Sequence, residues 1–242
     1  KLRDFQQNQP DIHLLEGHGN IGFAKACNLG AKAAKTKYLM FLNPDAILQP
    51  GALTQLVQVI EGEPAPCVAG ARLLNQDGSE QRGSRRGKLT PWSALVSMSG
   101  LARFEAASPL FTDMHWERRI VPNKPQSVPA VSGACMMFRA SDFWQLDGFD
   151  QGYFLHVEDL DICRRVIRQQ GRVLFVPDAQ IVHIGSTSKA NIYRVNWSKA
   201  KGLVRYFYRF SNSFLERVIA MVLAPLVVAA IMIRTVLIRL SQ

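Results

Sequence analysis

The chain has 242 residues, of which 48% are hydrophobic and 20% charged, so it can bury a sizeable core and is not a mainly disordered protein. No stretch of 18 uninterrupted apolar residues occurs, which excludes an ordinary polytopic membrane protein, and the four cysteines include no Cys-x-x-Cys pair typical of zinc or redox sites. The net charge of +10 is concentrated at the C-terminus, because residues 189–242 hold nine basic residues and only one acidic residue.

The first third of the chain alternates between short strands and helices. Hydrophobic periodicity predicts strands at residues 11–16, 38–42 and 67–74 and helices at 23–34 and 51–61. The run at 38–42 is apolar throughout, as expected of a strand buried on both faces. This alternation predicts an α/β sheet with helices on both faces.

The middle of the chain is less regular. Residues 79–127 mix basic residues, Ser, Gly, Pro and isolated aromatic residues, which is typical of a functional loop region or a mobile lid. Regular patterns then return, with strands predicted at 128–138, 172–176 and 181–184 and a helix at 158–170.

From about residue 197 the chain is predicted to be helical. One face carries Leu203, Phe207, Phe210, Phe214 and Val218, and the other carries Lys201, Arg205 and Arg209 at intervals of four residues. Residues 218–233 are apolar apart from Pro225, and as a helix they would be about 24 Å long, short of a bilayer core of roughly 30 Å.

These features favour an interfacial or shallowly inserted anchor at the inner face of the cytoplasmic membrane over a full span. The alternative is a helix that completes a soluble fold or forms a homodimer. No nucleic-acid partner is expected, because the rest of the chain is nearly neutral.

Asn43, Pro44 and Asp45 follow the buried strand at 38–42 directly. Ligands of open α/β sheets bind beyond the carboxyl ends of strands, and a carboxylate there can hold a divalent cation against phosphate oxygens. The alternative is an ordinary turn, since all three residue types favour turns.

Three acidic residues, Glu158, Asp159 and Asp161, open the predicted helix at 158–170. Acidic residues suit a helix N-terminus, but that preference does not require three of them. Asp159 points about 100° away from Glu158, so one acid could act as a general base in a cleft while the others hold the loop. His183 follows another strand, where it is either a ligand or a structural histidine.

Together with a Gly-rich turn at 19–24, the order of these features resembles family 2 of the inverting glycosyltransferases, and most closely its rhamnosyltransferases of cell-surface polysaccharide assembly. The resemblance covers roughly residues 11–190 and rests on stretches in the right order: 19–28, 38–45, 131–139, 148–150, 158–165 and 183–185.

The resemblance implies a GT-A fold, a Rossmann-like mixed sheet with helices on both faces, followed by an amphipathic and hydrophobic helical tail. Residues 1–195 would form the glycosyltransferase domain and residues 196–242 the membrane-associated tail. The family's first strand, with its Thr-Tyr-Asn-like end, has no match before residue 11, so we expect an incomplete first strand and donor pocket.

Site residues carry over from the resemblance position by position. Asp159 matches the catalytic base, and Glu158 would orient it or touch the acceptor. Asp45 and His183 would hold Mg²⁺ or Mn²⁺, although Asn43 stands where the family's metal motif has its first Asp. The expected donor contacts are Asn20, Gly22, Phe23, Asn28, Asn43 and Asp45, and the expected sugar or acceptor contacts are Gly133, Ala134 and Asp161.

The implied reaction is inverting transfer of a sugar from a dTDP- or UDP-linked donor to a saccharide or lipid-linked acceptor. The location would be the cytoplasm, with peripheral or tail-anchored attachment to the inner membrane. One alternative is a non-catalytic relative that binds nucleotides or carbohydrates. A processive synthase ranks last, because its Gln-x-x-Arg-Trp signature is absent.

Overall fold

The computed structural model describes residues 2–7, 9, 11–185 and 191–240. Within these residues the strands form a six-stranded sheet of order β1–β7–β3–β8–β2, with β5 paired to β8, and a separate pair of β4 and β6. The strands are β1 (Tyr38–Leu42), β2 (Ala46–Leu48), β3 (Cys67–Leu74), β4 (Arg85–Arg86), β5 (Gln126–Ser127), β6 (Ala130–Val131), β7 (Cys135–Arg139) and β8 (Arg172–His183). The α-helices are α1 (Leu2–Gln7), α2 (Phe23–Ala33), α3 (Ala52–Glu61), α4 (Pro91–Ser99), α5 (Ala140–Gln145), α6 (Glu158–Arg168), α7 (Ile192–Phe210) and α8 (Phe214–Leu240).

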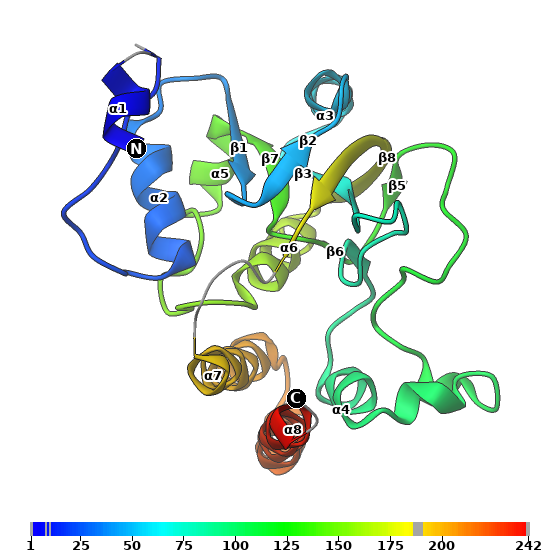
Figure 1. The fold of residues 1–242 in the computed structure, drawn as a ribbon. Helices are drawn as coiled ribbons and strands as arrows, with labels where there is room; N and C mark the ends of the chain where they lie inside the picture. Colours follow the sequence, from blue (N-terminus) through cyan, green and yellow to red (C-terminus); the bar gives the residue numbers. More distant parts are fainter. Residues whose placement is uncertain (1, 8, 10, 186–190, 241–242) are drawn as a thin grey trace.

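The large sheet is mixed, as predicted. Strands β3 and β8 run parallel, whereas β7 lies antiparallel between β1 and β3. Leu56 and Ile60 of α3 are fully buried against one face, and Ile162 and Val166 of α6 belong to the hydrophobic cluster on the other. Figure 1 shows α3 and α6 on opposite sides of the sheet, with α7 and α8 beyond α6. The prediction of helices on both faces is therefore confirmed.

Three predicted strands differ from the structure. Residues 11–16 form no strand, because they have no pairing partner and both Ile12 and Leu15 are exposed. Neither ladder hydrogen bonds nor apolar burial would therefore stabilise an extended conformation there. The strand predicted at 128–138 is interrupted at 132–134 and becomes β6 and β7. The two short strands predicted after residue 171 are one strand, β8, whose pairing with β3 shifts between Ala71 and Arg72.

Residues 79–127 include parts that are packed into the fold, and whether the segment also acts as a lid stays a prediction. Helix α4 starts with a capping box formed by Thr90 and Ser93, and its Ala94 and Val96 are fully buried. Arg85 is buried too, with its guanidinium bonded to Glu80 at 2.9 Å and to the Arg119 carbonyl at 2.8 Å. Some of the polar residues that made this segment look like a loop therefore bind one another inside the fold.

The predicted amphipathic helix near residue 197 is α7, but it is shorter than expected. Leu203, Phe207 and Phe210 are buried in the same hydrophobic cluster as α6, whereas Phe214 lies beyond the helix end and is exposed. The predicted boundary between residues 195 and 196 falls inside α7. The division into a domain and a tail remains a prediction.

Helix α8 has one packed face and one exposed apolar face. Its buried residues recur every three or four positions, at Ala220, Ala224, Val227, Ile231 and Thr235. Figure 1 shows α8 beside α4 and α7. The stretch Phe214–Val236 has 23 residues and a mean hydropathy of 2.3, so by length and composition it could cross a membrane. The helix continues through Pro225 and is longer than the 16-residue apolar run that the sequence analysis considered.

Two glycines provide a matched test of this packing. A Cβ at Gly70 in β3 would lie 2.3 Å from the Cβ of Val131, whereas a Cβ at Gly30 in α2 would meet nothing within 4 Å. Gly70→Ala should lower the free energy of unfolding by about 1–3 kcal/mol through overpacking. Gly30→Ala should raise it by about 0.5–1 kcal/mol through helix propensity. Urea unfolding curves measure both, and equal effects of the two substitutions would contradict this packing.

Candidate functional site

The end of β1 and the end of β8 bring Asp45 and His183 together. Ala46 pairs with His183 across the β2–β8 ladder, and the Ile184 N–H donates to the Asp45 carbonyl at 3.0 Å. The His183 Nε2 atom lies 3.1 Å from Asp45 Oδ1 and 3.2 Å from Asn43 Nδ2. The two residues predicted to hold a metal ion therefore lie side by side at one edge of the sheet.

Gln81, which the sequence analysis did not single out, fixes the His183 ring. Its side-chain nitrogen donates to the His183 carbonyl at 2.9 Å, so its side-chain oxygen faces His183 Nδ1 at 2.6 Å. With a neutral ring, the Nδ1–H then donates to that oxygen and Nε2 keeps its lone pair on the Asp45 side. Only a contact across 102 residues reveals this role, so no local pattern indicates it.

The side chains of Asp45 and His183 are suited to bind a divalent cation that is also coordinated by a bound ligand. A carboxylate oxygen and an imidazole nitrogen are suitable donors for Mn²⁺ or Mg²⁺, and a histidine ligand oriented through its other nitrogen is the usual arrangement. Within the described residues, no group of three or more His, Cys, Asp or Glu side chains could hold a metal ion. A cation here would therefore take its remaining ligands from diphosphate oxygens and water.

Gly133 and Ala134 join this pair to the acidic end of α6. The Asn43 N–H donates to the Ala134 carbonyl at 2.9 Å, and the Gly133 N–H donates to Asp159 Oδ2 at 3.0 Å. A Cβ at Gly133 would lie 3.2 Å from the Asp159 Cβ, so the close approach favours glycine. The interruption between β6 and β7 is thus the bridge between the two predicted centres.

Asp159 is held by a short ion pair with Arg86. The Arg86 guanidinium nitrogen NH2 lies 2.6 Å from Asp159 Oδ2 and also donates to the Val131 carbonyl at 2.6 Å. Burial opposes ionisation of Asp159, but Arg86 and the N–H groups of Gly133 and Leu160 outweigh it and hold its pKa below the ordinary value. The carboxylate is therefore ionised at neutral pH. Arg86 lies in the segment predicted only as a functional region, and nothing in its local sequence distinguishes it from Arg85.

Glu158 has the opposite character to its neighbour. Its side chain is buried, Oε2 has no hydrogen-bond partner within the described chain, and burial together with the Asp159 charge raises its pKa to about 8. Burial raises the pKa of the Cys27 thiol most, and the charge of Glu158 raises it further. Glu158 therefore lies close to Cys27 of α2. Glu158 is therefore largely protonated at neutral pH.

The backbone before α6 is strained. His156 and Val157 have φ angles of 67° and 75°, in the left-handed region that a β-branched residue such as Val rarely adopts. A Cβ at Gly202 of α7 would lie 3.1 Å from Val157 Cγ2, so α7 packs closely on this turn. The strain lies directly before the two acids, where a fixed backbone sets their directions.

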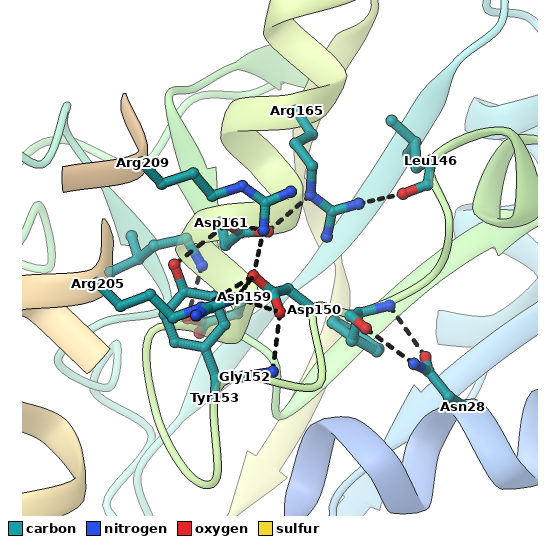
Figure 2. A network of polar contacts seen from close by, with 12 residues as sticks. Asn28, Leu146, Asp150, Gly152, Tyr153, Asp159, Asp161, Arg165, Arg205 and Arg209 are labelled. Carbon is teal, nitrogen blue, oxygen red and sulfur yellow. Dashed lines mark hydrogen bonds and ion pairs between the residues drawn. The ribbon is translucent and has the colours of Figure 1, made fainter. Parts of the chain in front are cut away.

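Asp161 belongs to a buried ion network and does not face an opening. It is fully buried, and its carboxylate binds Arg165 Nε at 2.6 Å, the Tyr153 hydroxyl at 3.2 Å and Arg209 at 3.3 Å. Figure 2 shows Arg209 and Arg205 reaching from α7 to Asp150 in the same network. This geometry gives Asp161 a structural role, so we do not propose an acceptor contact for it.

The predicted donor residues near α2 fall into two groups. Asn28 is buried and bonds both backbone polar groups of Phe149, at 2.8 and 2.9 Å, so it holds the loop before α6 (Figure 2). Asn20 accepts from the Gly22 N–H at 3.2 Å, and the Phe23 N–H donates to the Phe154 carbonyl at 2.8 Å. Asn20 and Gly22 lie at the start of α2 and stay donor predictions, whereas Asn28 is occupied by the loop.

Two relatives resemble the chain along most of its length. N-acetylglucosaminyl-diphospho-decaprenol L-rhamnosyltransferase of Mycobacterium tuberculosis H37Rv is 27% identical over 188 residues, 73% of this chain and 60% of that protein. Rhamnosyltransferase WbbL of Escherichia coli K12 is 25% identical over 234 residues, 90% of this chain and 82% of that protein. The chain thus spans about 60% of the length of the mycobacterial relative.

Two solved structures share the fold. GalNAc-T7 with UDP, GalNAc and Mn²⁺ superposes with a TM-score of 0.58 at 16% identity, covering 84% of this chain and 37% of that one. Mannosyltransferase PcManGT from Pyrobaculum calidifontis, in complex with GDP-Man and Mn²⁺, has a TM-score of 0.54 at 15% identity and covers 95% of this chain and 59% of that one. At such low identity these matches establish the fold and nothing more.

The family model described as "Glycosyl transferase family 2" matches residues 1–147, more than half of the chain. The matched region contains Asp45, Arg86 and Gly133, and the mixed sheet agrees with the expected GT-A fold. The chain belongs to glycosyl transferase family 2, has the GT-A fold and is similar to the rhamnosyltransferases of that family.

Proposed function

We propose that this chain transfers a sugar, rhamnose, from a dTDP- or UDP-linked donor to a saccharide or lipid-linked acceptor of cell-surface polysaccharide assembly, with inversion. The observation that carries the proposal is the continuous path from the Asp45 and His183 pair through Ala134 and Gly133 to Asp159. The similarity to rhamnosyltransferases of Mycobacterium tuberculosis and Escherichia coli supports rhamnose as the sugar.

Asp159 is the base in this proposal. Its Oδ2 atom is occupied by Arg86 and Gly133, whereas Oδ1 accepts only the Leu160 N–H at 2.8 Å among the described residues and has capacity for an acceptor hydroxyl. Asp159 removes the proton as the hydroxyl oxygen forms a bond to the anomeric carbon. The bond from that carbon to the diphosphate oxygen breaks on the opposite side, which inverts the configuration.

Asp45 and His183 would hold Mg²⁺ or Mn²⁺ at the diphosphate end of the donor. A cation bound there would neutralise the charge that develops on the departing diphosphate. Both solved neighbours contain Mn²⁺ with a nucleotide or nucleotide sugar, which supports this assignment for the fold. Asn43, which stands where the family motif has its first acid, directs its side-chain nitrogen at His183 Nε2, so a cation bound to that nitrogen would have to displace this contact.

We place the chain at the inner face of the cytoplasmic membrane through α8. The large apolar residues on its outer face, Phe214, Leu215, Met221, Val222 and Leu226, are all more than half exposed. An exposed apolar helix of this length is unfavourable in water and favourable at a lipid surface. Arg205 and Arg209, which the sequence suggested for the lipid headgroups, bind Asp150 instead.

Asp159→Asn should reduce sugar transfer by at least about a hundredfold, because it removes the proton acceptor. Donor binding should persist, and it can be followed as a Mn²⁺-dependent rise in melting temperature with dTDP-rhamnose and UDP-sugars. Asp45→Asn serves as the contrast, since it should weaken that Mn²⁺-dependent rise. Full turnover by Asp159→Asn would exclude this base, and donor binding without turnover in the unchanged chain would favour a non-catalytic binding relative.

Glu158→Gln should flatten the pH dependence of stability. The folded-state pKa of Glu158 lies near 8, above the ordinary value of 4.5, so the protonated form is favoured in the fold. The free energy of unfolding therefore decreases as the pH rises from about 4.5 through 8, and the neutral amide should lose this decrease. Urea titrations at pH 5 and pH 8 measure it, with Glu16→Gln at an exposed position as the control. An unchanged slope in Glu158→Gln would refute the assignment.

Substitution of Leu215, Val222 and Leu226 together by Ser should weaken binding to liposomes at least about tenfold, because it removes exposed apolar surface from α8. Flotation with vesicles that contain acidic phospholipid measures the bound fraction. The control replaces Leu110 and Ile120 by Ser, since both are exposed apolar residues far from α8 in sequence. Equal losses in the two variants would contradict a membrane-facing α8.

A further inference from the structure

Two adjoining cavities lie between α4, α7, α8 and the loop before β4. Their volumes are about 860 and 420 Å³, and the linings share Arg82, Ser97, Met98, His115 and Arg234. Because five lining residues are common to both, the two cavities share a wall, and the larger one is also lined by Glu105, Asp113 and Glu117. Neither cavity is lined by Asp45 or His183, so both are separate from the proposed cation site.

The smaller cavity is strongly basic. Arg82, Lys199 and Arg234 line it, and no acidic residue does so among the described lining residues. Arg82 is bound to Asp113 and Glu117, but Lys199 and Arg234 form no hydrogen bond or ion pair within the described chain. Three cations from three separate elements therefore converge on this cavity, and two of them make no hydrogen bond or ion pair with the described residues.

The same positive charges act on Lys199, and the charge of Asp159 opposes them. Burial lowers its pKa, and the charges of Arg86, Arg234 and Arg82 lower it further. Among the residues that line the two cavities, His115 Nδ1 and Glu117 Oε2 are buried without a hydrogen-bond partner in the described structure, and Glu117 lines only the larger cavity. Like charges held together are unfavourable, and an anion bound in the smaller cavity would relieve the repulsion among its cations.

The smaller cavity has a charged side and an apolar side. Arg86, which lines neither cavity, binds the proposed base Asp159, and the charges of both residues act on Lys199, so Lys199 marks the side toward that base. Ala230, Ile231 and Ile233 of α8 line the walls of the two cavities. A ligand in this cavity would place an anionic group among the three cations. One part of the ligand would extend toward Asp159, and another part would lie along the apolar residues of α8.

We propose that this cavity binds the diphosphate of a prenyl-linked saccharide acceptor through Lys199, Arg234 and Arg82. The acceptor sugar then lies toward Asp159 and the prenyl chain along α8. The proposal rests on the proposed function, in which the donor diphosphate occupies the Asp45 and His183 end and this anion belongs to the second substrate. A diphosphate offers several charged oxygens to three cations, as charge-assisted hydrogen bonds require.

The test is calorimetric binding of farnesyl diphosphate to the full chain in detergent micelles with a chelator present, which removes cation-dependent binding at Asp45. Lys199→Gln and Arg234→Gln should each weaken binding about tenfold, since each removes one charge-assisted contact. Lys201→Gln is the matched control. Lys201 lies on α7 as well, over the Trp197 ring at 5.4 Å, and does not line the cavity.

Parallel arms use farnesol, inorganic pyrophosphate and UDP with Mn²⁺. We expect farnesol and pyrophosphate to bind more weakly than farnesyl diphosphate, and UDP binding to be unchanged in the Lys199 and Arg234 variants. Unchanged farnesyl diphosphate binding in those variants, an equal loss in Lys201→Gln, or equally tight binding of farnesol would overturn the site. Equally tight binding of pyrophosphate would overturn the lipid-linked source. Absence of sugar transfer, by contrast, would count against the proposed function and leave these binding results unaffected.

Discussion

The ion pair between Arg86 and Asp159 is the interaction on which the arrangement of this site depends. Both side chains are nearly buried, and removing one partner of such a pair leaves an uncompensated charge that costs about 3–5 kcal/mol. Because Arg86 comes from β4 and Asp159 from α6, their bond ties the segment at 79–127 to the start of α6. The same guanidinium holds the Val131 carbonyl, so β6, β4 and α6 are fixed at one point.

The loop before α6 is held from two sides, and one side is the C-terminal part of the chain. Asn28 of α2 fixes Phe149, while Arg205 and Arg209 of α7 bind Asp150 (Figure 2). Because residue 202 is a glycine, α7 packs closely against the strained turn at Val157. Helix α7 thus helps to orient the two acids at the start of α6.

How much the sequence predicted depends on the range of the interactions concerned. Strands such as β1 and helices such as α6 follow from local periodicity, and Asp45 and His183 follow from their places after strand ends. Gln81 and Arg86 act across 102 and 73 residues, so local patterns could not separate them from their polar neighbours. Residues 11–16 failed as a strand for the related reason that a strand is stable only with a partner. Asn28 and Asp161 lie in motifs that carry the resemblance, but the fold uses their polar groups internally.

In the proposed function, the opposite pKa shifts of two adjacent acids would allow an anionic donor to bind beside a carboxylate base. If Glu158 and Asp159 were both ionised, two negative charges would repel the donor diphosphate. Burial keeps Glu158 protonated near neutral pH, whereas Arg86 and Gly133 keep Asp159 ionised. The site therefore holds one base and one neutral acid, and Arg86 offsets the single negative charge that remains. As a result, the proposed base has a low pKa. Such a weak base is sufficient if it takes the proton while the hydroxyl oxygen bonds to the sugar, because the hydroxyl becomes acidic at that stage.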